Sequence, residues 1–396
     1  MRILFVTSRF PFPPDKGDKI RAYHPIRLLS QHHEIDLLSF LDEPSTSECR
    51  ALMEKFCKKA TFVELPRLKM NLLLATGIFS RYPSQVFCYR SNSMKTQIRR
   101  HLAQKKYDLV HLVCGRLAEY GKELRSVPTV IDWIDSLSLS TERMYRSETD
   151  FLKKLGYYYE WKKMMRYETS TVRNFGACLI TSPVDREYLK SDSIFVVPNG
   201  VDTNAFKPIL CEKDIDIVFS GNMNYYPNIE SSVFFCRDVL PLILKEEPET
   251  KFCIVGKDPA KEVRRLHNGK DVIVTGYVDR VADWVNRSRL FVAPMICGAG
   301  IQNKIIEAMA CKVPVVSTEL GNAGIGAEKD KEIVVADHPK LLAEKILHML
   351  RNTNKRGKIA ENAFDMIQIR FSWEAVAAKI EQAYTFALNK RYKNEI

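Results

Sequence analysis

Short, almost continuously apolar runs recur along this sequence, and longer segments with helical spacing or mixed charge separate them. Apolar runs of this length between glycine, proline and polar residues are typical of strands buried on both faces of a parallel sheet. Strands that alternate with helices predict an α/β protein. The predicted strands are 3–7, 34–40, 61–65, 107–113, 129–134, 177–182 and 195–197, followed by 215–219, 250–256, 272–276, 291–294, 313–317 and 332–335.

The segments between these runs predict helices, which we place from the spacing of their apolar residues. One helix starts near Asp18, and others span 47–58, 141–174, 281–288, 303–310 and 339–351. The last segment predicts a long helix, because its apolar face follows helical spacing through Trp373, Val376, Ile380, Tyr384 and Ala387.

The stretch from 291 to 318 carries the clearest chemistry. A short apolar run is followed by a loop with Gly298 and Gly300, then by a predicted helix and a buried strand. A glycine loop that enters a helix presents free backbone N–H groups and the positive end of the helix dipole, which suit a phosphate. Lys304 adds a positive charge in the first turn, and Glu307 lies one turn further on the same face, where it can accept hydrogen bonds from a ribose.

Length and composition bound the remaining possibilities. The 396 residues suffice for two α/β domains, and the ten cysteines are scattered without a CxxC pair. They predict reduced thiols in a cytoplasmic protein, with no zinc site and no disulfide framework. The N-terminal apolar run is too short for a signal peptide, and none of the apolar runs approaches the ~18 residues that cross a bilayer.

At the residues of the 291–318 stretch, the sequence resembles the nucleotide-sugar signature of the GT-B glycosyltransferases of family 4. That signature has two glutamates eight positions apart, and EAMA followed by a PVV strand. Glu307 matches the second glutamate, which contacts the ribose in the family, whereas Ala299 stands in place of the first. The run GAGIQNKIIEAMA is more similar to sugar transferases linked to exopolysaccharide and PEP-CTERM/exosortase gene clusters, which also replace the first glutamate.

This resemblance implies the GT-B fold, in which two Rossmann-like domains with parallel sheets face each other across a cleft. The motif PNGVDTNAFKP resembles the end of the family's first domain. We therefore expect an acceptor-side domain over 1–207, a donor-binding domain over 208–370, and a terminal helix over 371–396 that returns to the first domain.

The resemblance also implies a set of donor-binding residues, which lie in loops after the strands of the second half. The family places the loop 220–228 at the donor pyrophosphate, usually with an arginine and a lysine, and this loop has neither. We expect Lys304 to supply the charge instead. The predicted donor-binding residues are Gly221, Asn222, Tyr277, Val278, Gly300, Ile301, Gln302, Asn303, Lys304 and Glu307.

In the first half, the loop after the first strand corresponds to the family's glycine loop beside the donor phosphates and the acceptor. A basic, solvated surface loop is the alternative. Val113 replaces a histidine that many members carry, and we expect His111 to be a buried structural histidine. Arg116 ends a strand where such sheets bind ligands. The acceptor-side candidates are Lys16, Asp18, Arg21 and Asp135, and the predicted catalytic residues are Gly17, Arg116, Lys304 and Glu307.

The activity that the resemblance implies is transfer of a sugar from a nucleoside diphosphate sugar to a hydroxyl of a lipid-linked or polysaccharide acceptor. The family retains the anomeric configuration and needs neither a metal nor a further cofactor. Two alternatives stay open on the same fold. Ala299 and Val113 favour a non-catalytic protein that binds nucleotides or sugar phosphates, and a nucleotide-sugar epimerase is the other.

The net charge of +12 bears on partners. No nucleic-acid motif accompanies it, so we expect no nucleic-acid partner. An anionic membrane face suits the charge, and two segments favour peripheral association at the inner face of the membrane. These are 153–166, which is basic and aromatic, and 67–81, which is apolar with basic ends. The alternative for 67–81 is a core helix with solvated ends, and for 153–166 it is a domain-spanning helix with a charged outer face.

Overall fold

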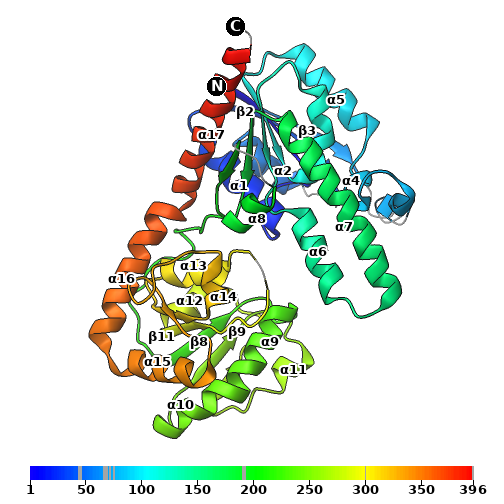
Figure 1. The fold of residues 1–396 in the computed structure, drawn as a ribbon. Helices are drawn as coiled ribbons and strands as arrows, with labels where there is room; N and C mark the ends of the chain where they lie inside the picture. The colour runs from blue at the N-terminus through cyan, green and yellow to red at the C-terminus, as the bar shows by residue number, and fades with distance from the viewer. Residues whose placement is uncertain are drawn as a thin grey trace. The chain divides into compact units, whose positions relative to one another are not determined.

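In the computed structural model, two parallel sheets each lie between helices (Figure 1). The structure describes residues 1–42, 47–65, 70, 73–74, 76–189, 193–298 and 300–394. By its internal contacts the chain divides into a first unit, residues 1–198 and 376–396, and a second unit, residues 199–375. This division falls earlier than the predicted boundary after residue 207. It also starts the returning segment at Val376, within the last helix, and not at residue 371.

The first unit is built on a seven-stranded parallel sheet in the order β3-β2-β1-β4-β5-β6-β7. Almost every residue of β1, β2 and β4 to β6 is buried, as the continuous apolar runs predict. The strands are β1 (Arg2–Thr7), β2 (Glu34–Leu41), β3 (Lys59–Glu64), β4 (Leu109–Val113), β5 (Thr129–Asp132), β6 (Ala177–Ile180) and β7 (Ile194–Val196). The helices that connect them are α1 (Gly17–Leu29), α2 (Ser47–Glu54), η1 (Gly77–Phe79), α4 (Ser84–Phe87), α5 (Asn92–Gln104), η2 (Gly115–Glu123), α6 (Leu137–Ser147), α7 (Phe151–Thr171), η3 (Val172–Asn174) and α8 (Pro183–Leu189).

The second unit has a six-stranded parallel sheet in the order β10-β9-β8-β11-β12-β13. Its strands are β8 (Ile215–Ser220), β9 (Phe252–Val255), β10 (Val272–Val274), β11 (Ser288–Ala293), β12 (Val315–Ser317) and β13 (Val334–Val335). Its helices are α9 (Tyr226–Phe234), η4 (Phe235–Val239), α10 (Leu240–Glu246), α11 (Lys261–Arg264), α12 (Val281–Asn286), α13 (Asn303–Ala310), α14 (Glu319–Ala323), α15 (Pro339–Arg351) and α16 (Thr353–Arg370). Both units therefore have the predicted parallel α/β architecture, and strand ends fall within a few residues of their predicted positions.

The last helix, α17 (Trp373–Asn394), belongs to the first unit from Val376 onward. Its Tyr384 hydroxyl lies 2.6 Å from Nδ1 of His111 in β4, and its Phe386 packs edge-on against Phe195 of β7. Burial lowers the pKa of His111 to about 4, so the imidazole stays neutral between the sheet and this helix. His111 is thus a buried part of the core.

An ion pair inside the first unit joins α1, β5 and the segment after β7. Arg21 and Asp132 are fully buried and lie 2.6 Å apart. The same guanidinium donates hydrogen bonds to the carbonyls of Val197 and Pro198. Because the carboxylate and the two carbonyls that Arg21 contacts all lie inside the first unit, its position favours a structural role over the acceptor contact that the sequence predicted.

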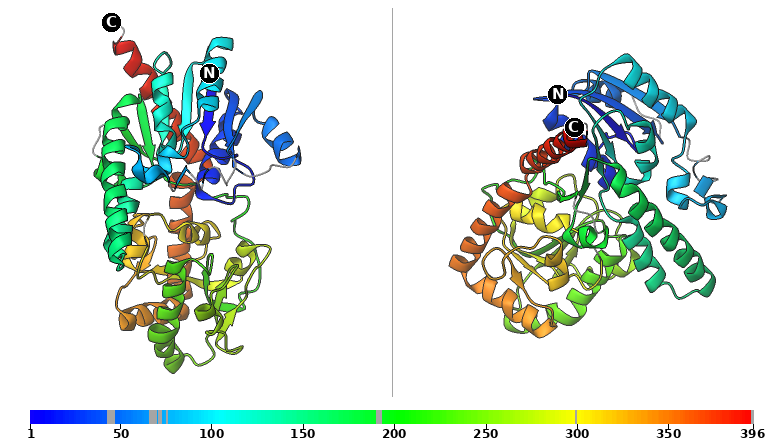
Figure 2. Two further views of the ribbon diagram at one scale, coloured as in Figure 1. Left: turned by 90° about the vertical axis from the view of Figure 1, so that its right-hand side faces the viewer. Right: turned by 45° about the horizontal axis from the view of Figure 1, so that its top comes forward.

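The predicted helical region 141–174 is two helices, α6 and α7, which lie side by side as a hairpin that extends from the sheet (Figures 1 and 2). The physical reason is a pair of side-chain N-caps. Ser136 accepts a hydrogen bond from the Leu139 amide, and Asp150 accepts one from the Lys153 amide, so a new helix starts at residue 151. The predicted helix 47–58 is also shorter and ends at Glu54.

Two features of the sequence fall outside the described residues. Ala299, which replaces the first signature glutamate, is one of them. The other is part of the predicted membrane segment 67–81, because residues 67–69, 71–72 and 75 are not described.

The contact between α17 and β4 generates a stability prediction. Tyr384→Phe leaves Nδ1 of His111 buried without its partner, and we expect unfolding to become easier by about 1–3 kcal/mol. Urea denaturation followed by circular dichroism measures this change. Tyr158→Phe, which removes a hydroxyl from an exposed ring, is the matched control. Equal stability of Tyr384→Phe and wild type would show that the hydrogen bond contributes nothing.

Candidate active site

Glycines allow the loops at the carboxyl ends of β8, β9 and β10 to approach one another closely. The Gly221 amide, after β8, donates to the carbonyl of Val255, and the Gly256 amide, after β9, donates to the carbonyl of Gly276. A Cβ atom on Gly256 would lie 1.7 Å from the carbonyl oxygen of Gly221. Gly256 also has a φ of +152°, so only glycine fits this position. The loops after β8, β9 and β10 are therefore held edge to edge.

The loop after β11 leads into α13 and leaves the start of this helix open. Gly300 has a φ of +73°, and its carbonyl lies so close to Gly324 that a Cβ there would approach it to 2.5 Å. Gln302 takes the N-cap position of α13 without a side-chain hydrogen bond, and the first turn holds no acidic residue. The helix N-terminus thus keeps uncapped amides and an uncompensated dipole, which suits an anion.

Lys304 connects this helix to the loop after β8. Its ammonium lies 2.6 Å from Oδ1 of Asn228 and 3.2 Å from Oε1 of Gln302. The Nδ2 of Asn228 in turn donates to the carbonyl of Asn222. The positive charge of α13 therefore sits at the loop 220–228, which lacks a basic side chain of its own. Sequence reasoning missed Asn228, which lies in the first turn of α9, just after the loop that follows β8.

Burial shifts the two ionisable groups of α13 in opposite directions. Burial lowers the pKa of Lys304 to about 8, although the Glu307 carboxyl partly opposes this shift. Burial raises the pKa of Glu307 to about 7, and the Lys304 ammonium opposes that shift in turn. Among the described residues, the Glu307 side chain makes no hydrogen bond or ion pair. Perturbed groups with unused hydrogen-bonding capacity at a sheet edge are typical of binding sites.

The other predicted donor residues lie on the same edge. Tyr277, just after β10, has a side chain that is 72% exposed, and Val278 packs partly on the core. Oδ1 of Asn222 accepts a hydrogen bond from the Asn224 amide. Ile301 packs on the core, and Asn303 opens α13 on an exposed surface. The structure therefore brings Gly221, Asn222, Tyr277, Val278 and the residues 300–304 to the carboxyl edge of one sheet.

The predicted residues of the first unit lie at the carboxyl edge of the first sheet. Lys16 and Gly17 begin α1, and Gly17 has open space where a side chain would stand. Asp18 pairs with Arg9 at 3.5 Å. The Asp135 carboxylate accepts a hydrogen bond from the Thr181 hydroxyl.

Arg116 is the first residue after Gly115 in η2, directly beyond β4. Its Nε and one terminal nitrogen lie 3.3 and 3.1 Å from the amide oxygen of Gln85, and its guanidinium stands 5.8 Å from the centre of the Tyr89 ring. Arg9 and Tyr89 were not predicted as site residues. They lie beside Arg116 only because β1, β4 and the segment after α4 meet here.

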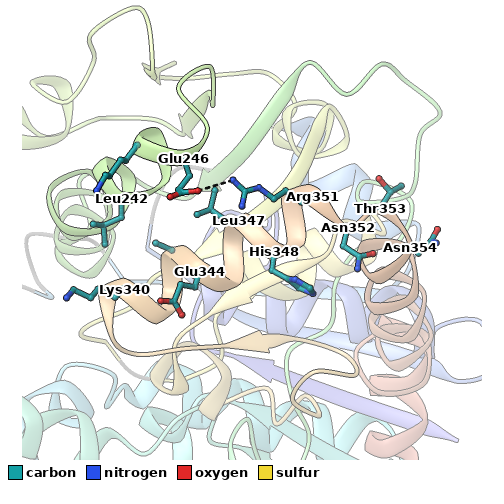
Figure 3. A pocket seen from close by; sticks show the side chains of 12 residues that line it. Leu242, Glu246, Lys340, Glu344, Leu347, His348, Arg351, Asn352, Thr353 and Asn354 are labelled. Carbon is teal, nitrogen blue, oxygen red and sulfur yellow. Dashed lines mark hydrogen bonds and ion pairs between the residues drawn. The ribbon is translucent and has the colours of Figure 1, made fainter.

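A groove of about 890 Å³ lies elsewhere on the second unit, between α10 and α15 (Figure 3). Its floor is apolar at Leu242 and Leu347, and Arg351 borders it by pairing with Glu246 and Glu247. It contains none of the predicted site residues. The groove is therefore a furrow between two helices, separate from the carboxyl edge of the sheet.

The comparisons with known proteins agree with this geometry. Residues 214–352 match the protein family described as "Glycosyl transferases group 1". A 44.6 kDa protein from the cps region of Klebsiella pneumoniae is 23% identical over 96% of this chain and 98% of its own length. The phosphatidyl-myo-inositol mannosyltransferase of Mycobacterium leprae is 26% identical over 50% of this chain and 54% of its own length.

Solved structures resemble the whole chain. Sucrose-phosphate synthase from Thermosynechococcus elongatus aligns with a TM-score of 0.67 at 18% identity, over 97% of this chain and 98% of that one. HepE from Anabaena, solved with UDP and glucose, aligns with a TM-score of 0.66 at 14% identity, over 97% and 99%. At such identities these likenesses establish the fold. The chain has the GT-B fold, and residues 214–352, in its second unit, match the group 1 glycosyltransferase family.

The pKa of Lys304 generates a prediction about pH. The ammonium is charged below about pH 8 and neutral above it, so affinity for UDP should be high at pH 7 and fall about tenfold or more by pH 9.5. Lys304→Arg should remove this dependence, because arginine stays protonated. Lys304→Ala should weaken UDP binding by about 1.5–3 kcal/mol at pH 7 and spare the nucleoside.

Isothermal titration calorimetry of UDP and uridine at several pH values measures both effects. Lys270→Ala, at an exposed lysine of the same unit, is the matched control. A pH profile that stays unchanged in Lys304→Arg, or an equal loss for UDP and uridine, would contradict a role at the diphosphate.

Proposed function

We propose that this protein moves a hexosyl group from a nucleoside diphosphate sugar to a hydroxyl of an acceptor, with retention of configuration and without a metal ion. The observation that carries the proposal is the position of Lys304 within the matched family segment. Its ammonium stands at the loop after β8 and beside the uncapped start of α13, where the phosphates of a donor fit. The resemblance to family 4, and to its exopolysaccharide-linked subgroup, supports this assignment.

Each residue has a definite task in the proposed reaction. As the bond from the sugar to the diphosphate breaks, negative charge grows on the leaving phosphate. The α13 amides and the Lys304 ammonium would stabilise that charge without reorganising. Glu307 would accept hydrogen bonds from the ribose, and it accepts them most strongly when its carboxylate is ionised, above its pKa of about 7. The name and ligands of HepE support UDP as the first nucleotide to test.

The acceptor that we propose is lipid-linked or a growing polysaccharide. Two relatives support this choice: one carries the name of a phosphatidyl-myo-inositol mannosyltransferase, and the other comes from a cps region. A lipid-linked acceptor requires the enzyme to work at a membrane surface. Within the part of the chain that the structure describes, no helix is long and apolar enough to span a membrane.

The α6–α7 hairpin supports peripheral binding to such a surface. At its turn, the side chains of Phe151 and Leu152 are each 76% exposed, and Leu155 is 56% exposed. Lys153 lies among them on an exposed surface. Apolar side chains flanked by lysines favour the interface of an anionic membrane. Lys163, which the sequence analysis counted with this basic surface, is instead buried and pairs with Glu160.

The donor site generates a prediction about activity. Glu307→Gln keeps the size of the side chain but removes its charge, so it should weaken UDP-sugar binding and turnover while the protein stays folded. Release of UDP from a panel of radiolabelled UDP-, GDP- and ADP-sugars, with and without membrane extract as acceptor, measures the activity. Unchanged kinetics in Glu307→Gln would contradict the ribose contact. Binding without any turnover would favour the non-catalytic alternative, and conversion of the sugar without an acceptor would favour an epimerase.

The hairpin generates a prediction about membranes. The protein should sediment with vesicles that contain anionic lipid at low salt, and high salt should release it, because each basic residue contributes about 1 kcal/mol that salt screens. Replacing Phe151 and Leu152 with serine and Lys153 and Lys154 with glutamate should abolish sedimentation. Lys261→Glu with Lys270→Glu, at exposed positions of the second unit, is the control. Protein that stays in the supernatant at low salt would contradict membrane binding, and an unaffected hairpin variant would place it elsewhere.

A further inference from the structure

Polar groups with unused hydrogen-bonding capacity meet at the carboxyl edge of the first sheet. The Tyr89 hydroxyl is buried, and among the described residues it has no hydrogen-bond partner. It lies within electrostatic range of two guanidinium groups, those of Arg9 and Arg116. A buried hydroxyl without a partner is unfavourable, and a ligand that accepts a hydrogen bond from it would remove this cost.

Of the two arginines near this hydroxyl, one is paired with carboxylates and the other is not. Arg9 is neutralised, because its guanidinium lies 3.2 Å from Asp42 and 3.5 Å from Asp18. Arg116 has no carboxylate within ion-pair distance among the described residues, and it donates hydrogen bonds to the neutral amide of Gln85. The uncompensated positive charge of this cluster is therefore that of Arg116.

The backbone fixes Arg116 in place. Cys114, which precedes η2, has a φ of +91°, a region that non-glycine residues rarely adopt. A Cβ on Gly115 would lie 2.2 Å from the ring of Trp133, so glycine is required there. The Arg116 side chain thus leaves a tightly constrained turn at the end of β4, directly over the Tyr89 ring.

We propose that Arg116 and the Tyr89 hydroxyl form a binding site for a phosphate group of the acceptor. The guanidinium offers donors beyond those used on Gln85, and the hydroxyl offers one more. Burial raises the pKa of Tyr89 to about 12, so the hydroxyl remains a donor at neutral pH. This inference rests on the proposed transfer to an acceptor and specifies its class. The acceptor is phosphorylated, either as a lipid phosphate or as a soluble phosphate.

The experiment is calorimetric titration of the full chain with geranyl phosphate, with saturating UDP present to occupy the donor site. We expect Arg116→Gln to weaken binding at least tenfold and Tyr89→Phe to weaken it severalfold. Both should leave the affinity for UDP unchanged. Arg90→Gln, which removes a neighbouring exposed arginine, should bind geranyl phosphate like wild type. Circular dichroism of each variant confirms that it folds.

The remaining ligands separate the outcomes. Geraniol, which lacks the phosphate, should not bind. Geranyl phosphate that binds at least tenfold more tightly than inorganic phosphate identifies a lipid source, whereas equal affinity supports phosphate recognition and overturns the lipid source. Geranyl phosphate bound equally by wild type and both site variants would overturn the proposal. If wild type fails to bind UDP, the proposed transferase function fails instead, and the two failures can be told apart.

Discussion

The backbone of Gly256 lies against the carbonyl of Gly221, and the candidate donor site is built around that contact. A side chain at Gly256 would push the loops after β8 and β9 apart, because its Cβ would overlap the Gly221 oxygen. The same loops bring Asn222 and Asn228 to Lys304. The close approach of Gly256 to Gly221 therefore helps to determine where the Lys304 ammonium lies.

The electrostatics of the donor site follow from this arrangement. The loop 220–228 lacks a basic side chain. Lys304, in the first turn of α13, supplies the positive charge there, because its ammonium contacts Asn228. Partial burial makes that charge more effective toward an anion, since the surrounding dielectric is lower than in water. The same burial lowers the pKa of Lys304 and raises that of Glu307, which makes both groups sensitive to pH in the neutral range.

In the first unit, some of the predicted site residues stabilise the fold, whereas another keeps hydrogen-bond donors available for a ligand. The Arg21 guanidinium donates hydrogen bonds to Asp132 and to two backbone carbonyls, and His111 is enclosed by the sheet and Tyr384. Arg116, by contrast, has only a neutral partner, although it ends a strand of the same sheet. From sequence, both Arg21, in a predicted helix, and Arg116, at a strand end, were predicted to face a ligand. Their different roles depend on which carboxylates the fold brings to each.

The two parallel sheets could be predicted from the sequence alone, because short apolar runs between glycines and prolines, alternating with helical segments, are typical of strands that are buried on both faces. It also placed the glycine loop, Lys304 and Glu307 at the start of a helix, because these features are local. The sequence analysis did not anticipate the break between α6 and α7, where Asp150 caps the new helix, or the burial of Lys163. The contacts of Lys304 with Asn228, of Arg21 with Asp132 and of Arg116 with Gln85 depended on the tertiary structure, because these partners lie far apart in the chain and the order of strands in each sheet brings them together.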